Sequence, residues 1–182
     1  LPYTSPTDLA ASSGAFLCSG LSEVEGLIFI PTSGTSGPGK RVCCTAADLA
    51  RTRDFFRHGM QYMVSPGRKV ALLMSGDRPG SVGQLLTQAM GDLDVSCQVF
   101  GFMQPGATGE NAMLNRLCDF GPDCLVGVPG QVLALARHPE AARLRLASVL
   151  LSGDTATRPL CAAITEAFSC SVFIHYGLTE TG

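Results

Sequence analysis

The sequence predicts an α/β fold, with a mainly parallel sheet and helices on both of its faces. The first observation is a set of short, mainly apolar segments, as expected of strands that are buried on both faces. These segments cover residues 70–74, 95–100, 124–128, 148–151 and 171–174. The second observation is that helix-like segments lie between them, and this alternation is typical of parallel α/β sheets. We therefore expect residues 1–182 to form a single α/β domain.

Apolar residues at helical spacing predict the helices. The first helix begins at Thr45, because Thr45 and Asp48 form a variant of the capping box. Its apolar stripe comprises Leu49, Phe56, Met60 and Met63. Further helices are predicted over residues 81–90, 110–120, 131–137 and 159–168, the last with Thr157 as its cap. Residues 1–9 contain two prolines and show no period.

Composition narrows the class of protein. The chain has 182 residues, of which 46% are hydrophobic, so one domain with a substantial core is expected. The net charge of −2 and the lack of a basic patch argue against nucleic acid as a partner. No apolar run approaches the roughly 20 residues that span a bilayer, which argues against a membrane partner. The eight cysteines lack metal-site spacing, so we expect reduced thiols in a cytoplasmic protein.

The chemically most suggestive segment is the loop of residues 32–40, which lies between two extended segments. Its glycines allow successive N–H groups to point at one anion, and its hydroxyls and Lys40 add further donors. A solvated turn is one interpretation. A Walker-type NTPase loop is a second, because residues 34–40 satisfy G-x-x-x-x-G-K. However, Arg41 stands where that loop has Ser or Thr, and an extended segment follows instead of a helix.

A third interpretation is a family resemblance. The loop resembles the phosphate loop T-S-G-T-T-G-x-P-K of the adenylate-forming superfamily of acyl-CoA synthetases, peptide-synthetase adenylation domains and luciferases. Ser36 replaces one Thr, and Pro38 lies one place early. A second motif of the superfamily, Tyr-Gly-x-Thr-Glu, is intact at residues 176–180 after a predicted strand. Residues 1–9 are also similar to the phenylacetate–CoA ligase branch, which is our preferred assignment.

The resemblance implies that ATP activates a carboxylic acid as an acyl-adenylate, which is then transferred to coenzyme A. It implies catalytic roles for Lys40, Thr179 and Glu180, with Glu180 as the Mg²⁺ ligand. Thr179 would bond the α-phosphate, and Tyr176 would stack on adenine. The residues implied in nucleotide binding are Thr32, Ser33, Gly34, Thr35, Ser36, Gly37, Lys40, Ser152, Gly153, Asp154, His175, Tyr176, Gly177 and Thr179.

Several assignments stay open at this point. Lys40 is alternatively a solvated surface lysine, and Asp154, which replaces the common Glu, alternatively caps the following turn. His175 lines the acyl pocket or is a half-buried residue at a strand end. Residues 101–103 and 128–129 are further candidates for the acyl pocket.

The extent of the protein is also an expectation. Relatives continue beyond the Tyr-Gly-x-Thr-Glu motif with a ribose-binding aspartate and a small C-terminal lid domain. We therefore expect this chain to be an N-terminal-domain fragment that is inactive by itself. The alternatives are a catalytically degenerate nucleotide-binding or interaction domain and, less favoured, a Walker-type NTPase. The acid, the acceptor and the assembly state, including a homodimer, are left open.

Overall fold

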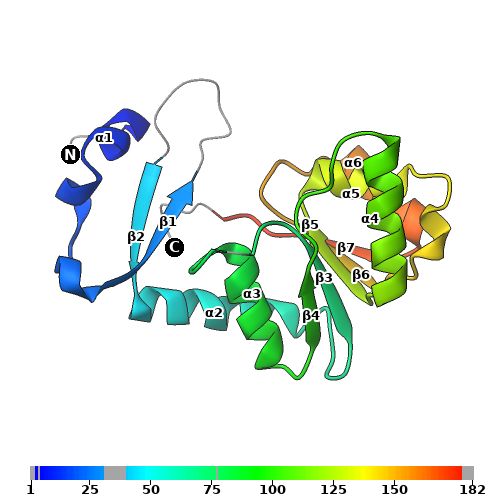
Figure 1. Cartoon of the computed structure of the whole chain (residues 1–182), viewed down its shortest axis with the longest axis horizontal. Helices are drawn as coiled ribbons and strands as arrows, with labels where there is room; N and C mark the ends of the chain where they lie inside the picture. The colour runs from blue at the N-terminus through cyan, green and yellow to red at the C-terminus, as the bar shows by residue number, and fades with distance from the viewer. Residues whose placement is uncertain (1–2, 4, 31–39, 77, 178–182) are drawn as a thin grey trace. The chain divides into compact units, whose positions relative to one another are not determined.

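The computed structural model describes residues 3, 5–30, 40–76 and 78–177. It divides into two compact units, one that includes the chain up to Thr52 and a larger one, Arg53–Gly177. The order of the elements along the chain can be followed in Figure 1. Each unit is described by itself.

The smaller unit contains a short helix and a pair of strands. Helix α1 is Pro6–Ala11, and strands β1, Val24–Ile30, and β2, Lys40–Thr45, pair antiparallel. Short 3₁₀ turns lie at Ser13–Phe16 and Leu21–Glu23. The antiparallel pairing has a physical reason, since only nine residues, 31–39, separate β1 from β2, and parallel pairing needs a longer crossover connection.

This pairing corrects one expectation. Ligands of a parallel α/β sheet bind at the carboxyl ends of its strands, and residues 32–40, 152–154 and 175–180 each follow an extended segment predicted from the sequence, so all three would be expected at that edge of one sheet. Instead, β1 and β2 form a separate two-stranded sheet. The strand at Lys40 also argues against the Walker-type NTPase, because that loop opens a helix at its lysine.

Helix α2, Ala46–Met60, begins at the predicted capping box. The Thr45 amide donates to Asp48 Oδ2 at 3.0 Å, and the Asp48 amide donates to Thr45 Oγ1 at 3.2 Å. These bonds satisfy two of the amides that a helix start leaves without intrahelical partners. The predicted start of this helix is therefore confirmed.

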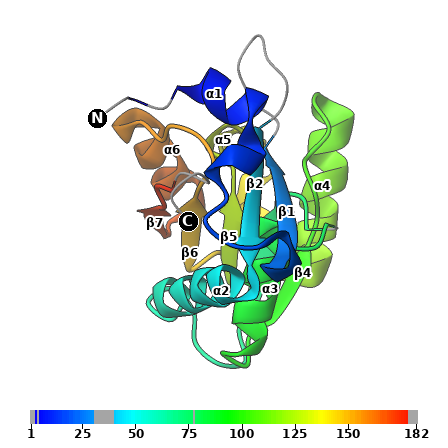
Figure 2. The same cartoon turned by 90° about the vertical axis from the view of Figure 1, so that its left-hand side faces the viewer.

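The larger unit contains a five-stranded sheet in the order β4-β3-β5-β6-β7, with every neighbouring pair parallel. Figure 2 shows β5, β6 and β7 following one another across this sheet. Its strands are β3, Lys69–Leu73; β4, Ser96–Val99; β5, Cys124–Gly127; β6, Ser148–Leu151; and β7, Ser171–Ile174. The helices between them are α3, Val82–Gly91; α4, Ala107–Phe120; α5, Pro129–Ala136; and α6, Arg158–Phe168. The predicted fold class is confirmed.

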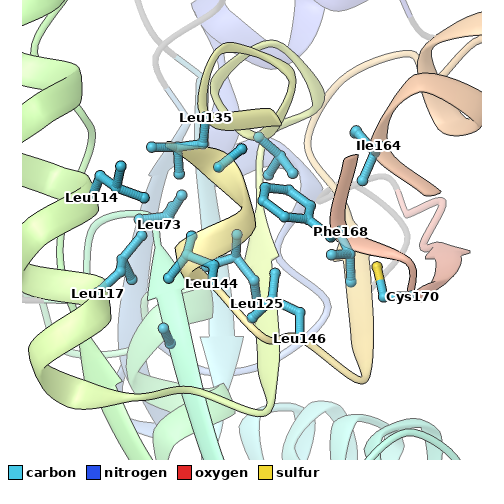
Figure 3. Close-up of a cluster of buried hydrophobic side chains, with 14 of the residues drawn as sticks. Leu73, Leu114, Leu117, Leu125, Leu135, Leu144, Leu146, Ile164, Phe168 and Cys170 are labelled. Atoms are coloured by element: carbon cyan, nitrogen blue, oxygen red, sulfur yellow. The ribbon is translucent and has the colours of Figure 1, made fainter. Parts of the chain in front are cut away.

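The two faces of this sheet pack against different helices. On one face, Leu73 and Leu125 belong to a buried cluster with residues of α4, α5 and α6, such as Leu117 (Figure 3). Because side chains alternate along a strand, Val126 and Leu150 point to the other face. There they line a pocket together with residues of α2 and α3. The described helices therefore cover both faces, as the sequence predicted.

The cysteines are free thiols. Burial raises the pKa of the Cys97 and Cys124 thiols to about 11, so both are protonated at neutral pH. A protonated, buried thiol is a poor nucleophile and a poor metal ligand. Cys124 and Cys170 are both buried, where a thiol packs as a small hydrophobe.

Candidate functional site

Two polar residues meet at the carboxyl edge of the parallel sheet. Ser152 follows β6, and His175 follows β7. The ladder continues past the strands, because the Ser152 amide donates to Gly127 O at 3.1 Å and the His175 amide to Leu151 O at 2.9 Å. These bonds hold both backbones in register. As a result, Ser152 Oγ lies 2.9 Å from His175 Nδ1, a hydrogen-bond distance.

Two aromatic rings of α2 flank the imidazole. The ring centroids of Phe55 and Phe56 lie 5.7 and 6.0 Å from that of His175, and the two phenylalanines lie 5.8 Å apart. These spacings are typical of tilted aromatic pairs. Burial lowers the pKa of His175 below its ordinary value, because the charged ring is poorly solvated there. The imidazole is therefore neutral at neutral pH.

The Ser152–His175 pair lies in the wall of an apolar cavity of about 180 Å³. Among the described residues, its lining carries no Asp, Glu, Lys or Arg. Ser152 and His175 supply its polar side-chain atoms. The lining residues are Phe55, Phe56, Gly59, Met60, Met63, Val82, Leu86, Val126, Leu150, Ser152, Phe173, Ile174 and His175. Such a lining suits an uncharged organic group.

His175 lines this pocket and is also half-buried directly after β7, so the structure agrees with both of its interpretations. Its role toward an acyl group stays a prediction. Residues 101–103 and 128–129, the other candidates for an acyl pocket, do not line this one. Met103 packs instead against the buried cluster on the opposite face of the sheet. The sequence missed the pocket role of Phe55 and Gly59. The adjacent phenylalanines were the available signal, because two neighbouring helical positions cannot both lie at the centre of one narrow stripe.

The residues after β6 form a tight turn. Gly153 has a φ of +85°, a conformation that L-residues rarely adopt, so glycine is required there for backbone reasons. Asp154 Oδ1 accepts a hydrogen bond from the Thr155 amide at 2.7 Å. Asp154 is exposed, and this contact is the turn-capping role given as its alternative.

Tyr176 and Gly177, which follow β7 and His175, have different surroundings. Tyr176 is 82% exposed, so most of its surface is accessible. A Cβ added at Gly177 would lie 3.0 Å from His175 Cε1. An alanine at position 177 would therefore require the imidazole to shift by a few tenths of an ångström.

Part of the predicted site lies outside the described residues. This holds for the loop residues Thr32, Ser33, Gly34, Thr35, Ser36 and Gly37, and for Thr179 and Glu180. Lys40 is described as the first residue of β2. Within the described ranges there is no group of three or more His, Cys, Asp or Glu side chains that could hold a metal ion. Among the same residues, no helix has the length and apolar character needed to cross a membrane.

Comparison with known protein structures identifies the fold. No protein-family model and no curated protein matches the chain. A 2-hydroxyisobutyryl-CoA ligase, solved with 2-HIB-AMP and CoA, matches 97% of this chain and 39% of its own, with a TM-score of 0.77 and 22% identity. The amide bond synthetase McbA from Marinactinospora thermotolerans matches 86% of this chain and 29% of its own (TM-score 0.64, 18% identity). A luciferase-like enzyme from the mealworm Zophobas morio matches 89% of this chain and 36% of its own (TM-score 0.58, 19% identity).

These likenesses confirm the fold that the sequence resemblance implied. The chain has the fold of part of an adenylate-forming acyl-CoA ligase. It spans about 40% of the length of the 2-hydroxyisobutyryl-CoA ligase. The assignment to the phenylacetate–CoA ligase branch stays a prediction.

Proposed function

We propose that the protein containing this chain activates a carboxylic acid with ATP. A carboxylate oxygen attacks the α-phosphorus, the bond from that phosphorus to the β-phosphate oxygen breaks, and pyrophosphate leaves. The thiol of coenzyme A then attacks the acyl carbonyl, loses its proton, and displaces AMP to give a thioester. One observation carries this proposal. The Tyr-Gly-x-Thr-Glu motif directly follows the last strand of a sheet with this fold, and its preceding residue, His175, lines an apolar pocket.

The proposed roles divide between nucleotide and acid. The loop of residues 32–40 supplies amide and hydroxyl donors for the β- and γ-phosphates. The exposed ring of Tyr176 offers adenine a face on which to stack, and the backbone at Gly153 reads its edge. Thr179 bonds the α-phosphate, and Lys40 adds a point charge. Glu180 is the residue that would hold Mg²⁺, which suits a carboxylate oxygen and would offset phosphate charge.

The apolar cavity beside His175, which we call the acyl-site pocket, is the proposed site for the organic part of the acid. It is apolar, and its neutral imidazole brings no charge. His175 and Tyr176 are adjacent in the chain, so the acyl and adenine positions are neighbours. Two anions must meet in such a reaction, and an uncharged wall beside them adds no repulsion.

A second candidate is a catalytically degenerate domain that binds nucleotide or a partner without chemistry. The departures at Ser36, Pro38 and Asp154 from the superfamily pattern favour it. The two functions separate in one experiment. The full-length protein is incubated with MgATP and a panel of carboxylic acids, with and without coenzyme A, and pyrophosphate release is followed. Acid-dependent release supports the ligase, whereas nucleotide binding without release with any acid overturns it.

A further inference from the structure

Of the described residues that line the acyl-site pocket, Gly59 is the one glycine. It lies inside α2, where glycine lowers helix stability relative to alanine. Its φ is not positive, so the backbone does not require glycine at this position. A Cβ added there would meet no described atom within 4 Å, so packing does not require glycine either. The missing side chain therefore leaves space on the wall of the pocket.

The neighbours of Gly59 in the helix are large. Phe55 lies four residues before it, on the same side of α2, and Met63 lies in the turn that follows the helix; all three line the pocket. The space between these two large side chains makes the pocket wider at this point. A side chain at position 59 would project toward the space where a ligand lies.

The size and polarity of the pocket limit its ligand. Its volume of about 180 Å³ is close to that of an engineered apolar cavity of about 150 Å³ in another protein, which stays dry and binds benzene. That volume accepts one six-membered ring or an aliphatic group of equal bulk. A charged group would find no countercharge in this lining and would lose its hydration.

We propose that the acyl-site pocket takes an uncharged apolar acyl group of about the size of one ring, and that Gly59 sets the upper limit on that size. This inference rests on the proposed function for its link to catalysis. It adds the class of acid and a residue that determines specificity. Acids with a second carboxylate or an ammonium group are rejected, because their charge would be buried without a partner.

The test uses the full-length protein and the variant Gly59→Leu, with Gly91→Leu as the matched control. Gly91 is also a helical glycine with open space around its Cβ position, but it does not line the pocket. Pyrophosphate release gives kcat/KM for cyclohexanecarboxylate, benzoate, butanoate and glutarate. In Gly59→Leu the ratio of either ring acid to butanoate should fall about 10–200-fold, the range for a mismatch of about one methylene. The ratio should not change in Gly91→Leu, and circular dichroism checks that both variants fold.

A second measurement separates this inference from the proposed function. Toluene, which is uncharged and has no carboxylate, is titrated into each protein and followed by methyl NMR shifts. Binding that Gly59→Leu abolishes and Gly91→Leu retains supports the pocket inference, even if no acid releases pyrophosphate and the ligase function fails. Pyrophosphate release with the same acid preference in all three proteins overturns the pocket inference and leaves the ligase function standing. A preference for glutarate over the ring acids also overturns it.

Discussion

Replacing Phe56 with alanine should destabilise the larger unit more than the same change at Phe55, its neighbour in α2. A fully enclosed aromatic side chain buries at least about 150 Å², which is worth about 3.8 kcal/mol at 25 cal/mol per Å². Phe56 is 9% exposed and Phe55 is 57% exposed. Scaled by burial, the two changes remove about 3.4 and about 1.6 kcal/mol of this contribution.

The two variants are a matched pair, because the two phenylalanines are neighbours in the same helix. Both rings lie at nearly the same distance from His175, 5.7 and 6.0 Å, so the loss of an aromatic contact to the imidazole largely cancels between the variants. Urea unfolding followed by far-ultraviolet circular dichroism should give free energies of unfolding that differ by about 2 kcal/mol, with Phe56→Ala the less stable. Losses within about 0.5 kcal/mol of each other, or a larger loss at Phe55, would refute the reasoning that burial on this face decides stability.

Three further outcomes are expected. Because burial lowers the pKa of His175, the unfolded chain binds a proton below about pH 6.5 before the folded chain does, so stability falls as pH drops from there toward the folded pKa. The midpoint of urea unfolding is measured at pH 7.5 and 5.5. His175→Gln should lack this part of the difference between the two midpoints, whereas His138→Gln should keep it; identical profiles for all three proteins contradict the assignment. Glu180→Gln should weaken Mg²⁺-dependent nucleotide binding in calorimetric titration of the full-length protein, and equal MgATP affinity would defeat its role as the Mg²⁺ ligand. Gly153→Ala should cost about 1–2 kcal/mol of unfolding free energy because of its positive φ, whereas Gly91→Ala should not destabilise; a neutral Gly153→Ala would show that this turn relaxes freely.

The local signals of the sequence were sufficient for most elements of the larger unit. Strands 148–151 and 171–174 match β6 and β7 at both ends, and the capping box at Thr45 is formed. Such signals succeed because they depend on residues a few positions apart. The missed helix α1 had the same kind of signal, since Ser5 and Asp8 form a capping box around it. The prolines near the terminus obscured it, although Pro6 occupies the first helical position, where proline is well tolerated.

The candidate site could be predicted only in part. The turn at residues 152–154 follows the buried strand β6, and His175 and Tyr176 follow the edge strand β7, so both segments marked the carboxyl edge of the sheet correctly. The partner of His175 was not predicted. Ser152 lies 23 positions earlier, and the two meet because Leu151 and Ile174, the residues before them, are aligned in the parallel β6–β7 pair.

By itself, the sequence determined the alternation of strands and helices, the capped helix starts and the position of the chemically suggestive segments. Those features depend on hydrophobic periodicity and on hydrogen bonds between near neighbours. The tertiary structure alone decided that β1 and β2 pair apart from the parallel sheet, and that Phe55 and Phe56 lie against His175. It also decided that the missing side chain of Gly59 borders a cavity. A cavity is the space that long-range packing leaves unfilled, and no local pattern of residues specifies where that space will be.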